Sequence, residues 1–182
     1  MNDLEKLMLG ELHDVYDAEQ QLLKALPGMA EKASAPGLKR ALASHLGQTR
    51  NHVRRLEEAF HALGQEPKRR SCKAMEGLID ESQLIAAEFE KNSALDAGLI
   101  AAAQKVEHYE IATYGTLVAW AEVLAATQVA SLLSETLAEE KQADSELTEL
   151  AMEHANPQAE SQDTPKKPEN TRATTKSMTK GT

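Results

Sequence analysis

The chain has 182 residues, a formal net charge of −9, 41% hydrophobic side chains and only 3% aromatic ones. This length suits one domain with a short extension, and the acidic balance argues against a nucleic-acid partner because phosphate backbones would be repelled. A single cysteine, Cys72, excludes an intramolecular disulfide and favours a reducing compartment. With neither a signal-peptide pattern nor a run of 18 apolar residues, we expect a cytoplasmic protein without a membrane span.

Apolar residues at spacings of three and four predict four long amphipathic helices and one shorter helix, the third. Asn2 or Asp3 can cap the first helix, Pro27-Gly28 predicts a break after it, and Gly64 predicts the end of the second. The expected bounds are 2–26, 38–63, 72–91, 94–124 and 128–154, with a short segment over 29–34.

Asn156-Pro157 predicts the end of the last helix, and the composition changes from Gln158 onward. Residues 158–182 are polar and basic and cannot bury enough apolar surface to offset their ordering entropy. We therefore expect a helical domain over 1–157 and a disordered tail over 158–182.

The long helices form two pairs, each with a short turn, and a connection of roughly 30 residues joins the pairs. That connection holds the third helix and is long enough to cross the molecule from end to end. A single long crossover between two antiparallel hairpins predicts an all-α, ferritin-like four-helix bundle with an extra helix in the crossover.

Each long helix carries polar residues on the stripe that should face the core. Burying a lone carboxylate costs at least several kcal/mol, so the same exception on four helices favours cations in the middle of the bundle. Carboxylates and imidazoles between helices suit iron or manganese. The candidate positions are Glu19, His45, His52, Glu107, Glu110, Glu140 and Asp144.

Plainer interpretations exist for most of these residues. Glu19 is also compatible with a surface position, and His45 and His52 with surface or hydrogen-bonded core histidines. Glu140 and Asp144 can alternatively pair with Lys141 or Arg50. Glu107 and Glu110 are the hardest to explain otherwise, because neighbouring like charges need a cation or a shared proton.

Five segments carry a resemblance to a known family: ELHDVYDAEQQLLKALP, HLGQTRNHVRRLEEAF, CKAMEGLIDE, AAAQKVEHYEIATYGTLVAWAEVL and TLAEEKQADSELTELA. Over residues 2–155 the chain resembles the ferritin-like, stress-induced bacterial proteins of the YciF type. The resemblance implies a helical bundle, usually dimeric, related to rubrerythrin and ferritin, and expression under stress. It implies no particular reaction, because the activity of that family is poorly defined.

The resemblance carries the same seven positions over as expected ligands, with one departure. Ferritin-like di-iron sites usually have Glu-x-x-His on the second and last helices. Here the second helix offers His45-x-x-Gln48 and the last offers Glu140-x-x-x-Asp144, with Gly47 and Gln48 where that family often has an acidic residue. Fewer carboxylates imply weaker or less symmetric metal binding, or one ion instead of two.

Our leading hypothesis is a stress-protective homodimer with a dinuclear iron or manganese site that reacts with oxygen or hydrogen peroxide. The alternative is a metal-free bundle that acts as a structural or interaction protein. A weaker alternative is DNA protection through the basic tail, which the acidic body disfavours.

Overall fold

The computed structural model describes residues 1–163, and the regular structure in that part of the chain is helical throughout. This confirms the predicted all-α class. The helices are α1 (Asp3–Lys32), α2 (Pro36–Ala62), α3 (Lys73–Glu88), α4 (Leu95–Val123) and α5 (Thr127–Leu150), followed by a π-helical turn (Ala151–Ala155) and α6 (Asn156–Asp163).

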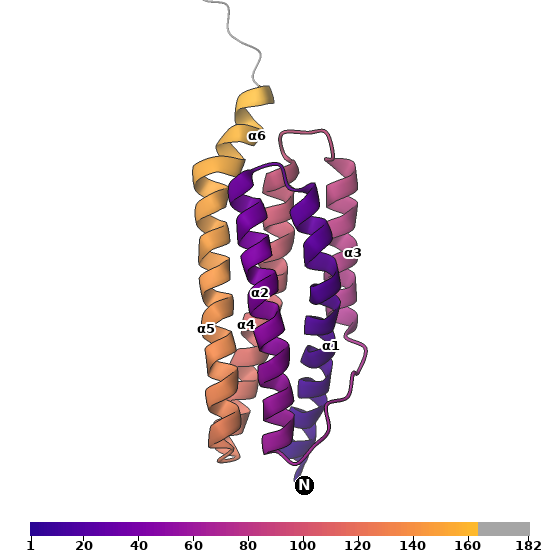
Figure 1. The fold of residues 1–182 in the computed structure, drawn as a ribbon, viewed down its shortest axis with the longest axis vertical. Helices are drawn as coiled ribbons and strands as arrows, with labels where there is room; N and C mark the ends of the chain where they lie inside the picture. The colour runs from indigo at the N-terminus through magenta and orange to yellow at the C-terminus, as the bar shows by residue number, and fades with distance from the viewer. Residues whose placement is uncertain (164–182) are drawn as a thin grey trace, which may run out of the picture.

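The four long helices α1, α2, α4 and α5 lie side by side along the length of the molecule (Figure 1). α1 packs on α2 and α4, and α5 packs on the same two helices, so each long helix has two long neighbours. α3 lies outside this group against α1 and α4, within the connection that takes the chain from one end to the other (Figure 1). None of the described helices is long and apolar enough to span a bilayer.

Two separate apolar cores fill the space between the helices. One contains Leu22, Leu42, Leu99 and Leu147, and the other contains Leu12, Leu56, Leu117 and Leu133, so every long helix contributes to both. On each helix the switch from one core to the other falls at the candidate polar positions. The polar residues therefore form a layer that the two cores enclose.

The first helix is longer than its sequence suggested. The break expected at Pro27-Gly28 is wrong, because α1 continues through Pro27 to Lys32. The proline removes one backbone donor near the end of the helix, whereas Met29 and Ala33 continue the buried stripe. Burial of these side chains offsets the lost hydrogen bond.

The helix ends follow local capping rules. Asn2 and Glu5 form a capping box at the start of α1, as the predicted Asn2 cap requires. Gly64 ends α2 in the left-handed conformation, with φ of +66°, and the amide of Gln65 donates to the Phe60 carbonyl. Ala125 takes the same conformation after α4, with φ of +55°, which is a strained position for a residue with a Cβ.

The last helical segment extends past its predicted end. The expected stop at Asn156-Pro157 is wrong, because the helix continues through the π-helical turn into α6, whose second residue is Pro157. Residues 158–163 are thus helical. The rest of the predicted tail, 164–182, lies outside the described residues, and the division into a domain and a tail stays a prediction.

Candidate metal centre

The layer between the two apolar cores holds six buried acidic and histidine side chains. They come from all four long helices: α1 contributes one, α2 two, α4 two and α5 one. The six are Glu19, His45, His52, Glu107, Glu110 and Glu140, and none is more than 5% exposed.

These side chains form two overlapping groups that share Glu140. In one group, His45, Glu107, Glu110 and Glu140 offer ligand atoms that all lie within 4.8 Å of one another. In the other, Glu19, His52 and Glu140 do the same. A carboxylate that belongs to both groups is the arrangement that a bridging ligand between two ions requires.

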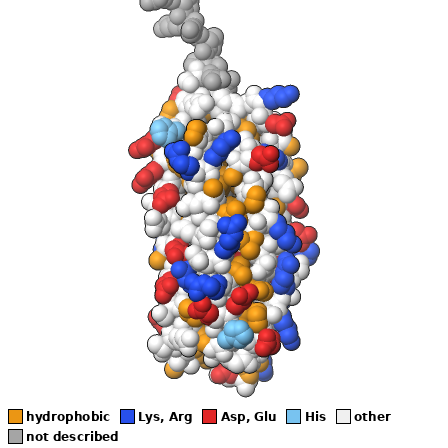
Figure 2. Space-filling model, in the orientation of Figure 1, with side chains coloured by type: hydrophobic (Ala, Val, Ile, Leu, Met, Phe, Trp, Pro, Cys, Tyr) orange, Lys and Arg blue, Asp and Glu red, His pale blue; other side chains and the backbone are white. Residues whose placement is uncertain are grey.

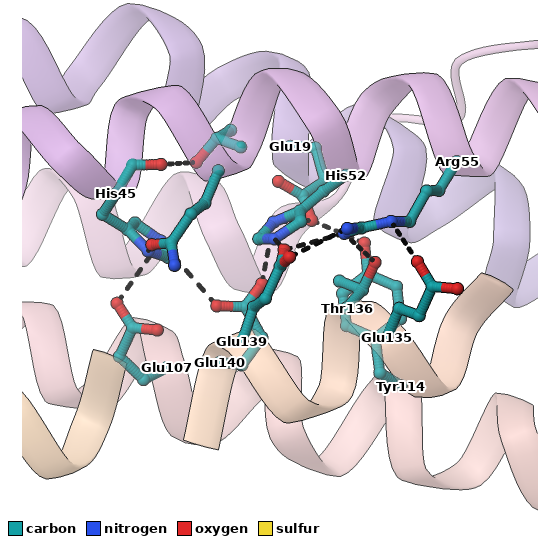
Figure 3. Close-up of polar contacts among 12 residues, drawn as sticks. Glu19, His45, His52, Arg55, Glu107, Tyr114, Glu135, Thr136, Glu139 and Glu140 are labelled. Atoms are coloured by element: carbon teal, nitrogen blue, oxygen red, sulfur yellow. Dashed lines mark hydrogen bonds and ion pairs between the residues drawn. The ribbon is translucent and has the colours of Figure 1, made fainter. Parts of the chain in front are cut away.

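His52 is oriented by a partner outside the cluster. Its Nε2 lies 2.8 Å from Glu139 Oε2, and Arg55 binds both oxygens of Glu139, with N–O distances of 2.7 and 2.8 Å. Its Nδ1 therefore faces the cluster, 2.9 Å from Glu140 Oε1 and 3.4 Å from Glu19 Oε1 (Figure 3). A carboxylate behind the ring is the usual support of a histidine that ligates a metal.

His45 repeats this arrangement with a neutral partner. Its Nδ1 lies 3.3 Å from Gln48 Oε1, and its Nε2 faces inward, 3.5 Å from Glu107 Oε1 and 3.8 Å from Glu140 Oε2 (Figure 3). Both histidines thus use one ring nitrogen outside the cluster and aim the other into it.

Many inward-facing atoms of the cluster have no hydrogen-bond partner. Although His52 Nδ1 lies close to Glu140 Oε1, the geometry is that of an ion pair and not of a hydrogen bond. Buried polar atoms are nearly always paired, so a concentration of exceptions in one place calls for a missing partner. The orphaned atoms are Glu19 Oε2, His45 Nε2, His52 Nδ1, Glu107 Oε2, and both carboxylate oxygens of Glu110 and Glu140.

The protonation of the cluster shows how strongly it needs positive charge. Burial, followed by the neighbouring carboxylates, holds the pKa of Glu107 and of Glu110 well above the ordinary value. Burial alone would lower the pKa of His52, but Glu140 and Glu19 outweigh it and raise that pKa to about 11. Burial acts to raise the pKa of Glu140, but the contact with His52 outweighs it and lowers that pKa. Without a cation, the cluster keeps protons.

The donor set fits two divalent cations. The four buried carboxylates, Glu19, Glu107, Glu110 and Glu140, carry four negative charges when ionised, and two neutral imidazoles add none. Two divalent ions would balance these charges and supply partners for the orphaned atoms. A donor set of carboxylate oxygens with some imidazole nitrogen suits iron or manganese, whereas structural zinc sites are rich in thiolate.

Asp144 is the predicted ligand that lies apart from the other six. Its Oδ1 accepts a hydrogen bond from Gln104 at 3.1 Å and lies 3.4 Å from Nε2 of the exposed His108. The alternative partners Lys141 and Arg50 pair with neither Glu140 nor Asp144 among the described residues, because Glu140 faces the two histidines.

Sequence reasoning missed Glu139, Arg55 and the role of Tyr114. The Tyr114 hydroxyl, fully buried, donates to Glu19 Oε1 and so fixes that carboxylate. For Arg55 the sequence does hold a signal, because it follows His52 by three residues and so lies on the same helix face. Glu139 had no comparable signal, because it faces partly outward and its side chain is 29% exposed.

A family model described as a domain of unknown function, DUF892, matches residues 3–160. The chain belongs to this family. It is 45% identical over 161 residues to Protein YciF of Escherichia coli (strain K12), covering 88% of this chain and 97% of that protein. This confirms the resemblance to YciF-type proteins that the sequence segments carried.

Solved structures of similar proteins agree with the fold. The crystal structure of the E. coli stress protein YciF matches with a TM-score of 0.82 and 44% identity, over 86% of this chain and 99% of that one. YcfI of Rhodopseudomonas palustris, whose description suggests a structural protein, matches with a TM-score of 0.79 and 46% identity, over 81% and 94%. A Xanthomonas campestris pv. campestris protein, 21% identical with a TM-score of 0.68 over 88% and 99%, shares the fold alone.

Proposed function

We propose that this DUF892-family protein is a ferritin-like stress protein whose buried cluster binds two iron or manganese ions and reacts with oxygen or hydrogen peroxide. The observation that carries the proposal is the set of orphaned carboxylate and imidazole atoms that converge from four helices. The side-by-side packing of two helical hairpins, with α3 in the long connection, supports the ferritin-like arrangement.

The residues have distinct roles in this proposal. Glu140, which belongs to both groups, would hold the ions together with Glu107, Glu110 and Glu19 as carboxylate ligands, and His45 Nε2 and His52 Nδ1 would be the nitrogen ligands. Bound iron or manganese would supply redox chemistry toward oxygen or peroxide. Tyr114 and Glu139 hold Glu19 and His52 in place, and the apolar cores on both sides exclude bulk water.

The similarity to the E. coli stress protein supports a protective role under stress. The expectations of a homodimer, a cytoplasmic location and no nucleic-acid partner stay predictions. On the face seen in Figure 2, acidic and basic side chains are interspersed around a strip of hydrophobic ones. That mixture is unlike the single-sign stripe of a nucleic-acid interface.

The second candidate function is a metal-free structural or interaction protein. It is favoured by the ion pair between His52 Nδ1 and Glu140, which partly neutralises the cluster, and by the description of the R. palustris relative. In that case protons, ion pairs and water would satisfy the buried carboxylates, and removing charge from the layer should cost nothing.

Elemental analysis of untagged protein, before and after anaerobic loading with ferrous iron or manganese, separates the two functions. We expect two ions per chain in the wild-type protein and a loss of at least one in Glu107→Gln, which removes a ligand at nearly constant volume. Asp144→Asn is the matched control, because this carboxylate lies outside the cluster and should leave both ions bound. Wild-type protein that binds no metal after loading would rule out the metalloprotein and leave the structural candidate.

A further inference from the structure

The cluster lies against the seam between α2 and α5, and this seam is closed at one end of the cluster. Arg55 spans it, with its guanidinium on both oxygens of Glu139 and its Nε 3.3 Å from Glu135 Oε2. The Arg55 side chain is only 11% exposed, and Thr136 is buried beneath it. Figure 3 shows this closure at the end of the cluster opposite His45.

The other end of the same seam holds a small cavity. A cavity of about 20 Å³ lies beside His45 and Glu107, and Gln48 and Glu146 also line it. Gln48 is half-buried and Glu146 is exposed, so the cavity is bordered by surface residues as well as by two residues of the cluster. A wider hollow of about 530 Å³ near Ser34, Pro36 and Leu150 touches none of the six cluster residues.

Small side chains leave this space unfilled. Ala41 on α2 and Ala143 on α5 line the cavity from opposite helices, and Leu42 and Leu147 line the rest of its apolar wall. A volume of about 20 Å³ holds about one water molecule. The same space would admit a single cation or a molecule the size of hydrogen peroxide, and it would exclude an organic peroxide.

We propose that the opening lined by Ala41, His45, Gln48, Glu107, Ala143 and Glu146 is the access route by which divalent cations and water-sized oxidants reach the cluster. This inference rests on the proposed metal site and adds where its ions and its small substrate arrive. The group containing His45, Glu107 and Glu110 fills first, because it borders the opening. The group containing His52 lies behind Arg55 and receives its ion across Glu140.

The charges along the route favour cations. Glu146 is an exposed carboxylate at the mouth, with only a neutral hydrogen bond from Gln142, and Glu107 is a carboxylate at the inner end. An acidic mouth raises the local cation concentration and speeds association, more so at low ionic strength. Gln48 presents an amide to the route and adds no charge to it.

The first test measures the rate of metal uptake in the full-length chain. Manganese is mixed with metal-free protein, and free manganese is followed by its electron paramagnetic resonance signal. We expect Ala143→Leu to slow uptake by about tenfold or more, because three added carbon atoms fill a space for one water, with the final stoichiometry unchanged. Ala130→Leu is the control for overpacking: it lies on the same helix and is likewise 8% exposed, but is outside the cavity.

A second variant tests the mouth without disturbing the core. Glu146→Lys reverses an exposed charge and should slow uptake by roughly tenfold at low salt, with a smaller effect at high salt. Glu122→Lys makes the same change in net charge at an exposed position on α4 that does not line the cavity, and it should leave the rate within about twofold.

The oxidant is tested by size in metal-loaded protein. Hydrogen peroxide should react with the wild-type site, tert-butyl hydroperoxide should react at least about tenfold more slowly, and Ala143→Leu should slow hydrogen peroxide. Uptake at the wild-type rate in both Ala143→Leu and Glu146→Lys would overturn the route while leaving the metal site intact. A final stoichiometry reduced in Ala143→Leu, with normal uptake in Glu146→Lys, would also overturn it. A wild-type protein that binds no metal would overturn both proposals.

Discussion

At the scale of single residues, the Glu139–Arg55 pair determines which nitrogen of His52 faces the cluster. Glu139 accepts a hydrogen bond from His52 Nε2, and Arg55 binds both oxygens of Glu139 in a bidentate pair. Contacts with Arg55 hold the pKa of Glu139 below its ordinary value, so it remains an anionic acceptor at neutral pH. The ring orientation thus depends on two residues that do not touch the metal position.

We therefore predict that Glu139→Gln lowers manganese affinity by about 10- to 100-fold, the usual cost of removing a carboxylate behind a ligating histidine. A competition titration at pH 7 against a chelator of known affinity measures it. Glu135→Gln is the control, because Glu135 also pairs with Arg55 but is 60% exposed and does not touch His52. Equal affinities in the wild type and Glu139→Gln would show that His52 needs no such support.

Periodicity predicted the positions of most cluster residues, but helix rotation limited it. Glu140, Ala143 and Leu147 follow one another at spacings of three and four and are all buried. Asp144 is four residues after Glu140, about 40° further around a helix of 3.6 residues per turn, and that rotation turns it toward Gln104 on α4. Residue spacing within one helix does not show where the neighbouring helix lies, so Asp144 could not be separated from Glu140 by sequence alone.

At the scale of elements, hydrogen bonds to Asp17 on α1 hold the connection between α2 and α3 against the first helix. Its carboxylate accepts from Arg69 Nε at 2.7 Å, from the Cys72 amide at 3.0 Å and from Gln21 Nε2 at 2.7 Å. Within the basic run 68–70, Arg69 is held here and the Arg70 amide donates to the His13 carbonyl. Asp17 thereby positions the start of α3.

Asp17→Asn should lower the free energy of unfolding by about 1–3 kcal/mol at pH 7, because it leaves buried donors without their charged acceptor. Burial acts to raise the pKa of Asp17, but hydrogen bonds from Cys72, Gln21 and Arg69 outweigh it and lower that pKa. The stability that Asp17 contributes is therefore fully present above the pKa of this carboxyl in the unfolded chain. It is lost as pH falls through the lower pKa of the folded state.

Urea unfolding of the wild type and Asp17→Asn at neutral and acidic pH measures both effects. The difference between the two proteins should narrow in acid. Asp80→Asn, a change at an exposed carboxylate on α3, is the control and should stay within about 0.5 kcal/mol of the wild type. A difference that persists unchanged in acid would contradict the role of the ionised carboxylate.

The helices themselves were largely predictable, whereas their ends were less so. Gly64 and Asn2 set their boundaries through local backbone chemistry that the sequence displays. Pro27 and Pro157 were misleading, because burial of the following side chains carries α1 past Pro27, and a π-helical turn leads directly into α6 at Pro157. The packing of α3 also depends on a tertiary contact, since a Cβ at Gly98 would lie 2.6 Å from Ile85.

At the scale of the whole molecule, the polar layer opposes folding unless it is neutralised. Two apolar cores stabilise the bundle from either side, and the carboxylates between them must hold protons or cations. This need makes stability depend on pH in opposite ways for the two forms of the protein. The pKa values of Glu19, Glu107 and Glu110 are raised by burial, so the folded state binds more protons than the unfolded chain above the ordinary carboxyl range.

We predict that the metal-free protein loses stability as pH rises from 5 to 8. Because the folded state holds the extra protons, each additional bound proton lowers the free energy of unfolding by about 1.4 kcal/mol per pH unit. The pKa of His52, raised to about 11, acts in the same direction above its unfolded value of 6.5. Because the pKa of Glu140 is lowered, its titration affects stability below pH 5 and does not reverse the loss of stability between pH 5 and 8.

Manganese should reverse this trend, because cations replace protons and bind more tightly as the ligands become deprotonated. Thermal unfolding in a chelator and in excess manganese, at intervals from pH 5 to 8, measures both profiles. The difference between the unfolding midpoints with manganese and with chelator should increase with pH in the wild type and in Asp144→Asn, whose carboxylate lies outside the layer. In Glu107→Gln this difference should be smaller than in the wild type. Metal-free Glu107→Gln should also be more stable than the wild type at pH 8, since glutamine is neutral without the proton that the buried Glu107 has to keep. A manganese effect that is the same at every pH would mean that the ion binds to surface carboxylates, and the polar layer would then be stabilised by its own protons.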